Sequence, residues 1–135
     1  MTFYFKLLFV LFLLIPNICE AQKVKRKFRG NYKGIIESYK INSGGEYLTV
    51  KETPISILVD KRKLTINIGN VNFNGVPEIK QKSRRILELS LKRPNDFGTE
   101  KISIYRKNRY LIRKGISPQP NTELLKQKKR DQKAP

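Results

Sequence analysis

The amino-acid sequence predicts an all-β protein, a small antiparallel meander of seven to eight strands that is closed or nearly closed into a barrel. Two observations carry this prediction. Short segments alternate between apolar and polar residues, and a period of two is typical of half-buried strands. Turn signals built from Gly, Asn and Pro separate these segments about every 8–12 residues. The body of the chain shows no sustained helical period.

Each expected strand follows from its own alternation. The first begins at Phe28 and places Tyr32 and Ile36 on one face. The apolar face changes after Ile36, which predicts a bend there. Asn42–Gly45 is an expected turn. The later expected strands are 47–50, 55–59, 64–68, 71–73, 86–91, 102–105 and 110–113.

Two further turns connect these strands. Asn74-Gly75 is the strongest short-range hairpin signal in the chain, and Lys107-Asn108 predicts a tight turn near its end. The expected inward-facing residues are Tyr32, Ile36, Leu48, Ile66, Ile68, Phe73, Leu87, Leu89, Ile102, Ile104 and Ile112. A barrel of this size either holds one small apolar ligand or is filled by its own side chains, and these bulky residues favour a filled interior.

The first strand also carries a resemblance to a known family. Phe28-Arg-Gly-Asn-Tyr32 resembles the G-x-W start of lipocalin-like (calycin) barrels, with Tyr32 in place of the Trp. The resemblance implies a closed meander in which Arg109 or Arg113 of the last strand packs over that aromatic ring. It also implies a carrier of a small apolar ligand. The residues expected to line such a pocket are Tyr32, Ile36, Phe73, Leu89 and Ile104.

Residues 1–21 have the composition of a secretory signal peptide. Lys6 precedes an unbroken apolar run, Pro16 follows it, and small side chains stand at Cys19 and Ala21. We expect a bacterial-type cleavage after Ala21 and a secreted or periplasmic protein. An uncleaved anchor is one alternative, although a spanning helix needs about 20 mostly apolar residues. A lipoprotein modified at Cys19 is another.

The rest of the chain divides into three predicted segments. Residues 22–27 form a basic linker, and residues 28–116 form the β-barrel domain. Residues 117–135 begin with a Pro-containing break and continue as a basic tail, which is expected to be a short helix or disordered. Leu124 and Leu125 would dock such a helix on the barrel.

Composition excludes several classes of chemistry. The chain has no His, and its single Cys lies in the predicted signal peptide, so the exported part has no disulfide, no thiol nucleophile and none of the usual nitrogen or sulfur metal ligands. The carboxylates sit mainly at expected turns beside Lys or Arg, where surface charge balance is their expected role. We therefore predict no catalytic residue, no metal site and no cofactor. An enzyme of unusual type would need a buried carboxylate pair.

The formal net charge is +18, which favours an anionic polymer or an anionic lipid surface as partner. Export argues against nucleic acid. Codon bias in an AT-rich genome, together with solubility, is the competing explanation. The best candidate face is the basic and aromatic stretch 105–114, although its tyrosines could instead simply pack on the sheet. The predicted polyanion-binding residues are Arg106, Lys107, Arg109, Arg113 and Lys114.

Overall fold

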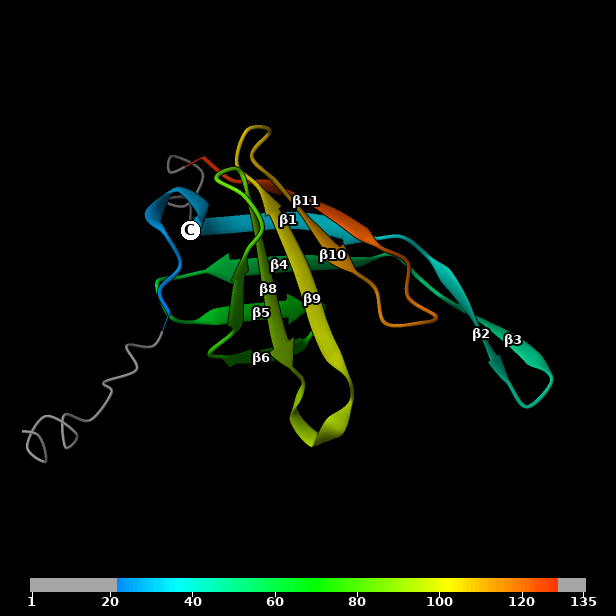
Figure 1. Cartoon of the computed structure of the whole chain (residues 1–135). Helices are drawn as coiled ribbons and strands as arrows, with labels where there is room; N and C mark the ends of the chain where they lie inside the picture. Colours follow the sequence, from blue (N-terminus) through cyan, green and yellow to red (C-terminus); the bar gives the residue numbers. More distant parts are fainter. Residues whose placement is uncertain (1–21, 129–135) are drawn as a thin grey trace, which may run out of the picture.

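A computed structural model describes residues 22–128 of the 135-residue chain (Figure 1). The described part is all-β, apart from two short 3-10 turns, η1 (Arg26–Phe28) and η2 (Pro94–Asp96). The predicted signal peptide lies outside the described residues. The strands are β1 (Gly30–Ile36), β2 (Tyr39–Ser43), β3 (Glu46–Val50), β4 (Thr53–Val59), β5 (Leu64–Ile68), β6 (Val71–Gly75), β7 (Glu78–Gln81), β8 (Ile86–Lys92), β9 (Thr99–Tyr105), β10 (Tyr110–Lys114) and β11 (Thr122–Lys126).

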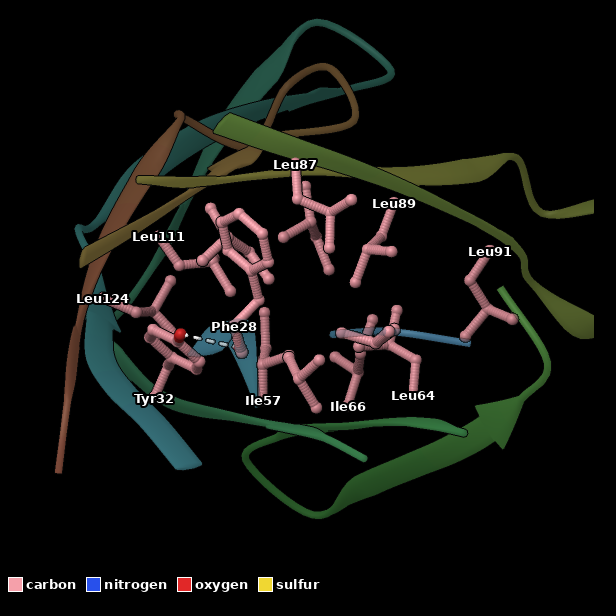
Figure 2. Close-up of a cluster of buried hydrophobic side chains, with 14 of the residues drawn as sticks. Phe28, Tyr32, Ile57, Leu64, Ile66, Leu87, Leu89, Leu91, Leu111 and Leu124 are labelled. Atoms are coloured by element: carbon pink, nitrogen blue, oxygen red, sulfur yellow. Dashed lines mark hydrogen bonds between the residues drawn. The ribbon is translucent and has the colours of Figure 1, made fainter. Parts of the chain in front are cut away.

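Nine strands form one antiparallel sheet that curves into a half-barrel around the core (Figures 1 and 2). The strand order is β6-β5-β4-β1-β11-β10-β9-β8-β7, and β2 and β3 form a separate two-stranded sheet. The predicted all-β, barrel-like class is therefore confirmed. β6 and β7 are consecutive in the chain and stand at the two edges of the sheet, so the sheet has an open seam between them.

The tail contains a strand instead of the predicted helix or disordered segment. β11 pairs with β1 and with β10, and so joins the two halves of the sheet. Leu124 is completely buried, whereas its neighbour Leu125 is 58% exposed. This alternation suits a strand, and β1 and β10 would otherwise each present an unpaired edge. The domain therefore continues beyond residue 116.

The segment predicted to be a basic linker is also part of the fold. Val24 is completely buried, and its N–H donates a hydrogen bond to the Lys61 carbonyl at 2.8 Å. Phe28, at the end of η1, is completely buried as well. Two apolar residues among the cations thus hold residues 22–27 against the sheet.

The second and third strands form an arm that projects from the body (Figure 1). The expected bend is present, since β1 ends at Ile36 and β2 begins at Tyr39. Gly44 and Gly45 form the turn of the arm with φ angles of +63° and +95°, which favour glycine. The prediction that Leu48 faces the core is wrong, because the arm pairs only with itself and leaves Leu48 55% exposed.

The hairpin predicted at Asn74-Gly75 is also wrong. Both residues lie in β6, and the turn before that strand is at Gly69, whose φ is +56°. Gly75 pairs with Leu64, and a Cβ on it would come within 2.9 Å of a methyl group of Leu91. Close packing, and not turn geometry, therefore explains the glycine at this position.

The inward faces of the strands enclose one hydrophobic core (Figure 2). Leu87, Leu89 and Leu91 of β8 face Ile57, Leu64 and Ile66 across the interior. In β10 the buried residue is Leu111 and not the predicted Ile112, which is only half-buried. The core consists of Val24, Phe28, Tyr32, Ile36, Ile55, Ile57, Val59, Leu64, Ile66, Leu87, Leu89, Leu91, Ile102, Ile104, Leu111 and Leu124.

Within residues 22–128, no helix is long and apolar enough to cross a membrane.

Candidate functional site

One end of the sheet concentrates positive charge, and we call it the basic end. The antiparallel pairing brings to this end the segment before β1, the loops β4–β5, β7–β8 and β9–β10, and the end of β11. Asp60 is the only acidic residue in these segments, and its carboxylate accepts a hydrogen bond from the Lys61 N–H at 2.7 Å. The segments are 22–29, 60–63, 82–85, 106–109 and 126–128.

Backbone contacts hold these segments together. The Arg106 N–H donates to the Arg85 carbonyl at 2.9 Å, which joins the β9–β10 loop to the β7–β8 loop. The Lys126 N–H donates to the Arg109 carbonyl, also at 2.9 Å. The Lys27 ammonium donates to the Arg84 carbonyl at 2.7 Å. Figure 1 shows η1, these two loops and the end of β11 gathered at the upper left of the molecule.

The cations at this end are close enough to affect one another. Partial desolvation and the charges of Arg106, Lys25 and Arg84 lower the pKa of the Lys27 ammonium below its ordinary value. Beside it, Arg85, Arg106 and Lys107 line a surface hollow of about 360 Å³. Positively charged side chains from two loops thus line this shallow, open surface hollow.

The opposite end of the sheet has a different charge. Its connections are residues 37–38, 51–52, 69–70, 93–98 and 115–121. They contain three acids and two cations, namely Glu37, Glu52, Asp96, Lys51 and Arg93. Among the turns and connecting segments of residues 22–128, the net positive charge therefore lies mainly at one end of the sheet.

The structure separates the five predicted polyanion-binding residues. Arg106, Lys107 and Arg109 are exposed in the β9–β10 loop and belong to the basic end. Lys114 is exposed but pairs with Lys101 near the other end of β10. Arg113 is completely buried, so its assignment to a surface site is wrong. The predicted register of β10 placed Ile112 inward, whereas the observed register places Leu111 and Arg113 inward.

Arg113 is buried because Glu100 neutralises it. Its Nε donates to Glu100 Oε2 at 2.8 Å, and its Nη2 donates to Glu100 Oε1 at 2.9 Å. Nη2 also donates to the side-chain oxygen of Gln119 at 2.8 Å. The half-buried Arg93 donates from Nε to Glu100 Oε1 at 2.7 Å, and its guanidinium lies 5.4 Å from the Phe73 ring centre. The network ties β9 and β10 to the loops that follow β8 and β10.

The protonation of Glu100 reflects these contacts. Burial alone would raise the pKa of its carboxyl, but the hydrogen bonds and charges of Arg113 and Arg93 outweigh burial and lower the pKa below its ordinary value. Among the side chains whose burial the structure describes, Glu100 is the one buried carboxylate, so these contain no buried carboxylate pair. In the same part of the chain, no three potential metal ligands come together.

The five predicted ligand-lining residues lie in or against the hydrophobic core. Tyr32, Ile36, Leu89 and Ile104 are each 1% exposed, and Phe73 packs against the cluster that they form. All five therefore belong to the single hydrophobic core or pack against it.

The contacts of Tyr32 test the packing of Arg109 or Arg113 over its ring that the family resemblance implies. Its hydroxyl donates to the Phe28 carbonyl at 2.9 Å, and burial raises its pKa to about 12, against an opposing effect of the Arg109 charge. The ammonium of Lys126 lies 6.0 Å from the centre of its ring. The cation over the aromatic ring therefore comes from β11, and Arg113 points into the network around Glu100 instead.

The predicted site left out most cations of the basic end, among them Lys27, Arg84 and Arg85. Each lies in a run of basic residues at a chain segment outside the expected strands. Such runs were a usable signal, but only the strand order shows that the loops containing them lie next to Arg106 and Lys107.

The chain matches no protein-family model, and comparisons with curated proteins and with solved structures find no match either. Its function therefore has to be inferred from its own geometry and charge.

Proposed function

We propose that this protein is an exported, non-enzymatic module that binds an anionic component of the cell envelope through its basic end. The observation that supports this proposal is the segregation of charge. The segments of the basic end contain one acid, Asp60, whereas the connections at the other end are close to neutral. The proposed cellular location rests on the signal-like composition of residues 1–21.

The uneven distribution of charge favours a binding role over compositional bias. A chain enriched in Lys by codon usage, or by a need for solubility, would carry the excess at both ends of its sheet. Clustering has a cost, because neighbouring cations repel one another. After desolvation, the charges of nearby cations are the further cause that lowers the pKa of Lys27. Binding of an anion by the cluster would offset that cost.

The mechanism is electrostatic attraction followed by ion pairing. Guanidinium groups such as those of Arg85 and Arg106 can make paired hydrogen bonds to phosphate, sulfate or carboxylate oxygens. Lys107 adds a mobile point charge beside the hollow that it lines with them. A partner that carries many such groups would also release counterions on binding, which makes its affinity depend strongly on salt.

Retention on immobilised heparin and on lipopolysaccharide across a salt gradient tests this proposal. The protein used is residues 22–135. One variant replaces Arg85, Arg106 and Lys107 by Gln, and a matched control replaces the exposed Lys40, Lys51 and Lys92 by Gln. Each loses three charges. We expect the first variant to elute at clearly lower salt than the control.

Equal shifts for the two variants would contradict a localised site, because they would show that only net charge matters. Elution of the unaltered protein at low salt would contradict polyanion binding altogether. The second proposal, a carrier of a small apolar ligand, has less support, because its expected lining residues are packed in the core.

A further inference from the structure

A row of apolar side chains runs across the outer face of the sheet, next to the basic end. Its members stand directly opposite one another on four neighbouring strands: Leu125 pairs with Tyr110, Tyr110 with Tyr105, and Tyr105 with Ile86. The two tyrosine rings stack with their centres 4.8 Å apart and their planes 13° from parallel. Leu125 is 58% exposed, and the other three are half-buried. We call these four residues the apolar row.

Each member of the apolar row is followed or preceded in the chain by a cation of the basic end. Ile86 follows Arg85, Tyr105 precedes Arg106, Tyr110 follows Arg109 and Leu125 precedes Lys126. The strands thus place hydrocarbon and aromatic rings on the outer face and, one residue further, positive charge at the end of the sheet. The surface is amphipathic over the width of four strands.

The row is confined to one side of the sheet. Beyond Leu125 the same level continues through Lys33 on β1, Ser56 on β4 and Asn67 on β5, all of which are polar. The outward-facing residues at this level are therefore polar on some strands and apolar on others. At this level, the apolar residues lie on β8, β9, β10 and β11, which include the two strands joined by the loop that carries Arg106 and Lys107.

A soluble polyanion needs only the cations, but the surface of an anionic lipid layer matches the whole arrangement. Its phosphate groups lie above hydrocarbon, so a protein that adsorbs there presents cations to the headgroups and apolar or aromatic side chains to the layer beneath. Tyr suits this boundary because its ring is apolar and its hydroxyl is polar.

We propose that the partner of the basic end is the surface of a lipid layer with anionic headgroups, and that the apolar row inserts into it. This inference rests on the proposed function and names the partner more closely. It requires that contact with lipid changes the surroundings of Tyr110, whereas binding of heparin leaves the apolar row in water.

The chain contains no Trp, so a single introduced Trp reports on its own surroundings. We would prepare the Tyr110→Trp variant and, as a matched control, Tyr47→Trp on the projecting arm, where Tyr47 is 71% exposed. Each is mixed with vesicles of phosphatidylglycerol and phosphatidylethanolamine, some with brominated acyl chains. We expect a blue shift and quenching by bromine for Tyr110→Trp, and neither for Tyr47→Trp.

A second pair of variants measures the contribution of the apolar row to binding. Tyr110→Thr combined with Leu125→Thr removes apolar surface and keeps strand-forming residues, and Tyr47→Thr with Leu48→Thr does the same on the arm. In vesicle sedimentation at moderate salt, we expect the first pair to reduce the fraction bound by about tenfold or more, and the second to leave it unchanged. Heparin retention should stay the same for both.

The outcomes separate the two proposals. If Tyr110→Trp stays unshifted while vesicle binding still depends on Arg85, Arg106 and Lys107, the protein adsorbs by charge alone and lipid insertion is wrong. If the Thr pair at 110 and 125 lowers heparin retention as much as vesicle binding, the apolar row does not distinguish lipid. Absence of both heparin and vesicle binding would overturn the proposed function itself.

Discussion

Arg113 and Glu100 form a buried ion pair in a protein whose buried side chains are mostly apolar. Both side chains are completely buried, and two hydrogen bonds of 2.8 and 2.9 Å join them. A buried ion pair contributes little net stability compared with apolar residues, but breaking it is expensive because one charge is left without its partner. The stability of the folded protein therefore depends on the carboxylate of Glu100.

Glu100→Gln should destabilise the protein by about 3–5 kcal/mol, because the Arg113 guanidinium would remain buried without a counter-charge. Glu88→Gln is the matched control, since Glu88 forms only an exposed pair with Lys82 at 3.3 Å and should cost about 1 kcal/mol or less. Urea unfolding followed by circular dichroism measures both. Similar losses for the two variants would show that the buried pair has no special role.

The same carboxylate predicts how stability depends on pH. The pKa of Glu100 is lowered in the folded state, so its contribution is fully present above the pKa in the unfolded chain, about 4.3. That contribution is lost as the pH falls through the folded pKa. Melting temperatures between pH 7 and pH 2 should therefore converge for the unaltered protein and Glu100→Gln in acid. A constant difference between them over this range would contradict the lowered pKa.

At the scale of single elements, β11 is the strand that completes the sheet. It lies between β1 and β10, and its inward residue Leu124 belongs to the core. Its outward residue Leu125 belongs to the apolar row. A single strand thus serves the interior through one leucine and, in our proposal, the lipid surface through the next.

Leu124→Ala and Leu125→Ala should separate these two roles. Leu124→Ala removes a completely buried side chain and should cost about 2–5 kcal/mol of unfolding free energy. Leu125→Ala, at 58% exposure, should cost about 0.5 kcal/mol or less. Thermal or urea unfolding of the two variants gives the comparison. If Leu125→Ala cost as much as Leu124→Ala, the orientation of β11 would be different.

At the scale of the whole molecule, the cations clustered at one end, which we propose bind an anion, also lower the stability of the folded state by repelling one another. A net charge of +18, with much of it in neighbouring loops, produces repulsion within the folded state that salt reduces. A surface selected for its interaction with an anion would keep this repulsion in spite of its cost.

Neutralising Arg85, Arg106 and Lys107 with Gln should therefore raise the melting temperature at low salt more than neutralising Lys40, Lys51 and Lys92. The difference should shrink as sodium chloride is added to about 0.1 M and above, because the Debye length is then about 10 Å or less and salt screens the repulsion between the loops. Differential scanning calorimetry at several salt concentrations tests this. A control triple that stabilises equally would show that the repulsion is not concentrated at the basic end.

The sequence also predicts part of this molecule correctly at each scale. Alternation with a period of two identified the β class, and in β8 it identified Leu87, Leu89 and Leu91 as one face, because that period is a local property of the strand. The same rule failed in β10, where alternation alone favours Ile112 as the inward residue and cannot show that the Arg113 side chain pairs with Glu100. Asn74-Gly75 failed because close packing against Leu91 also requires glycine.

By itself, the sequence determined the all-β class, the large positive charge and the absence of His from the whole chain, since local periodicity and composition do not depend on folding. Only the tertiary structure decided that residues 122–126 form a central strand, that Arg113 is buried and that separate basic runs meet at one end. Those features depend on contacts between residues far apart in the chain, such as the pairing of β1 with β11, and no local pattern encodes them.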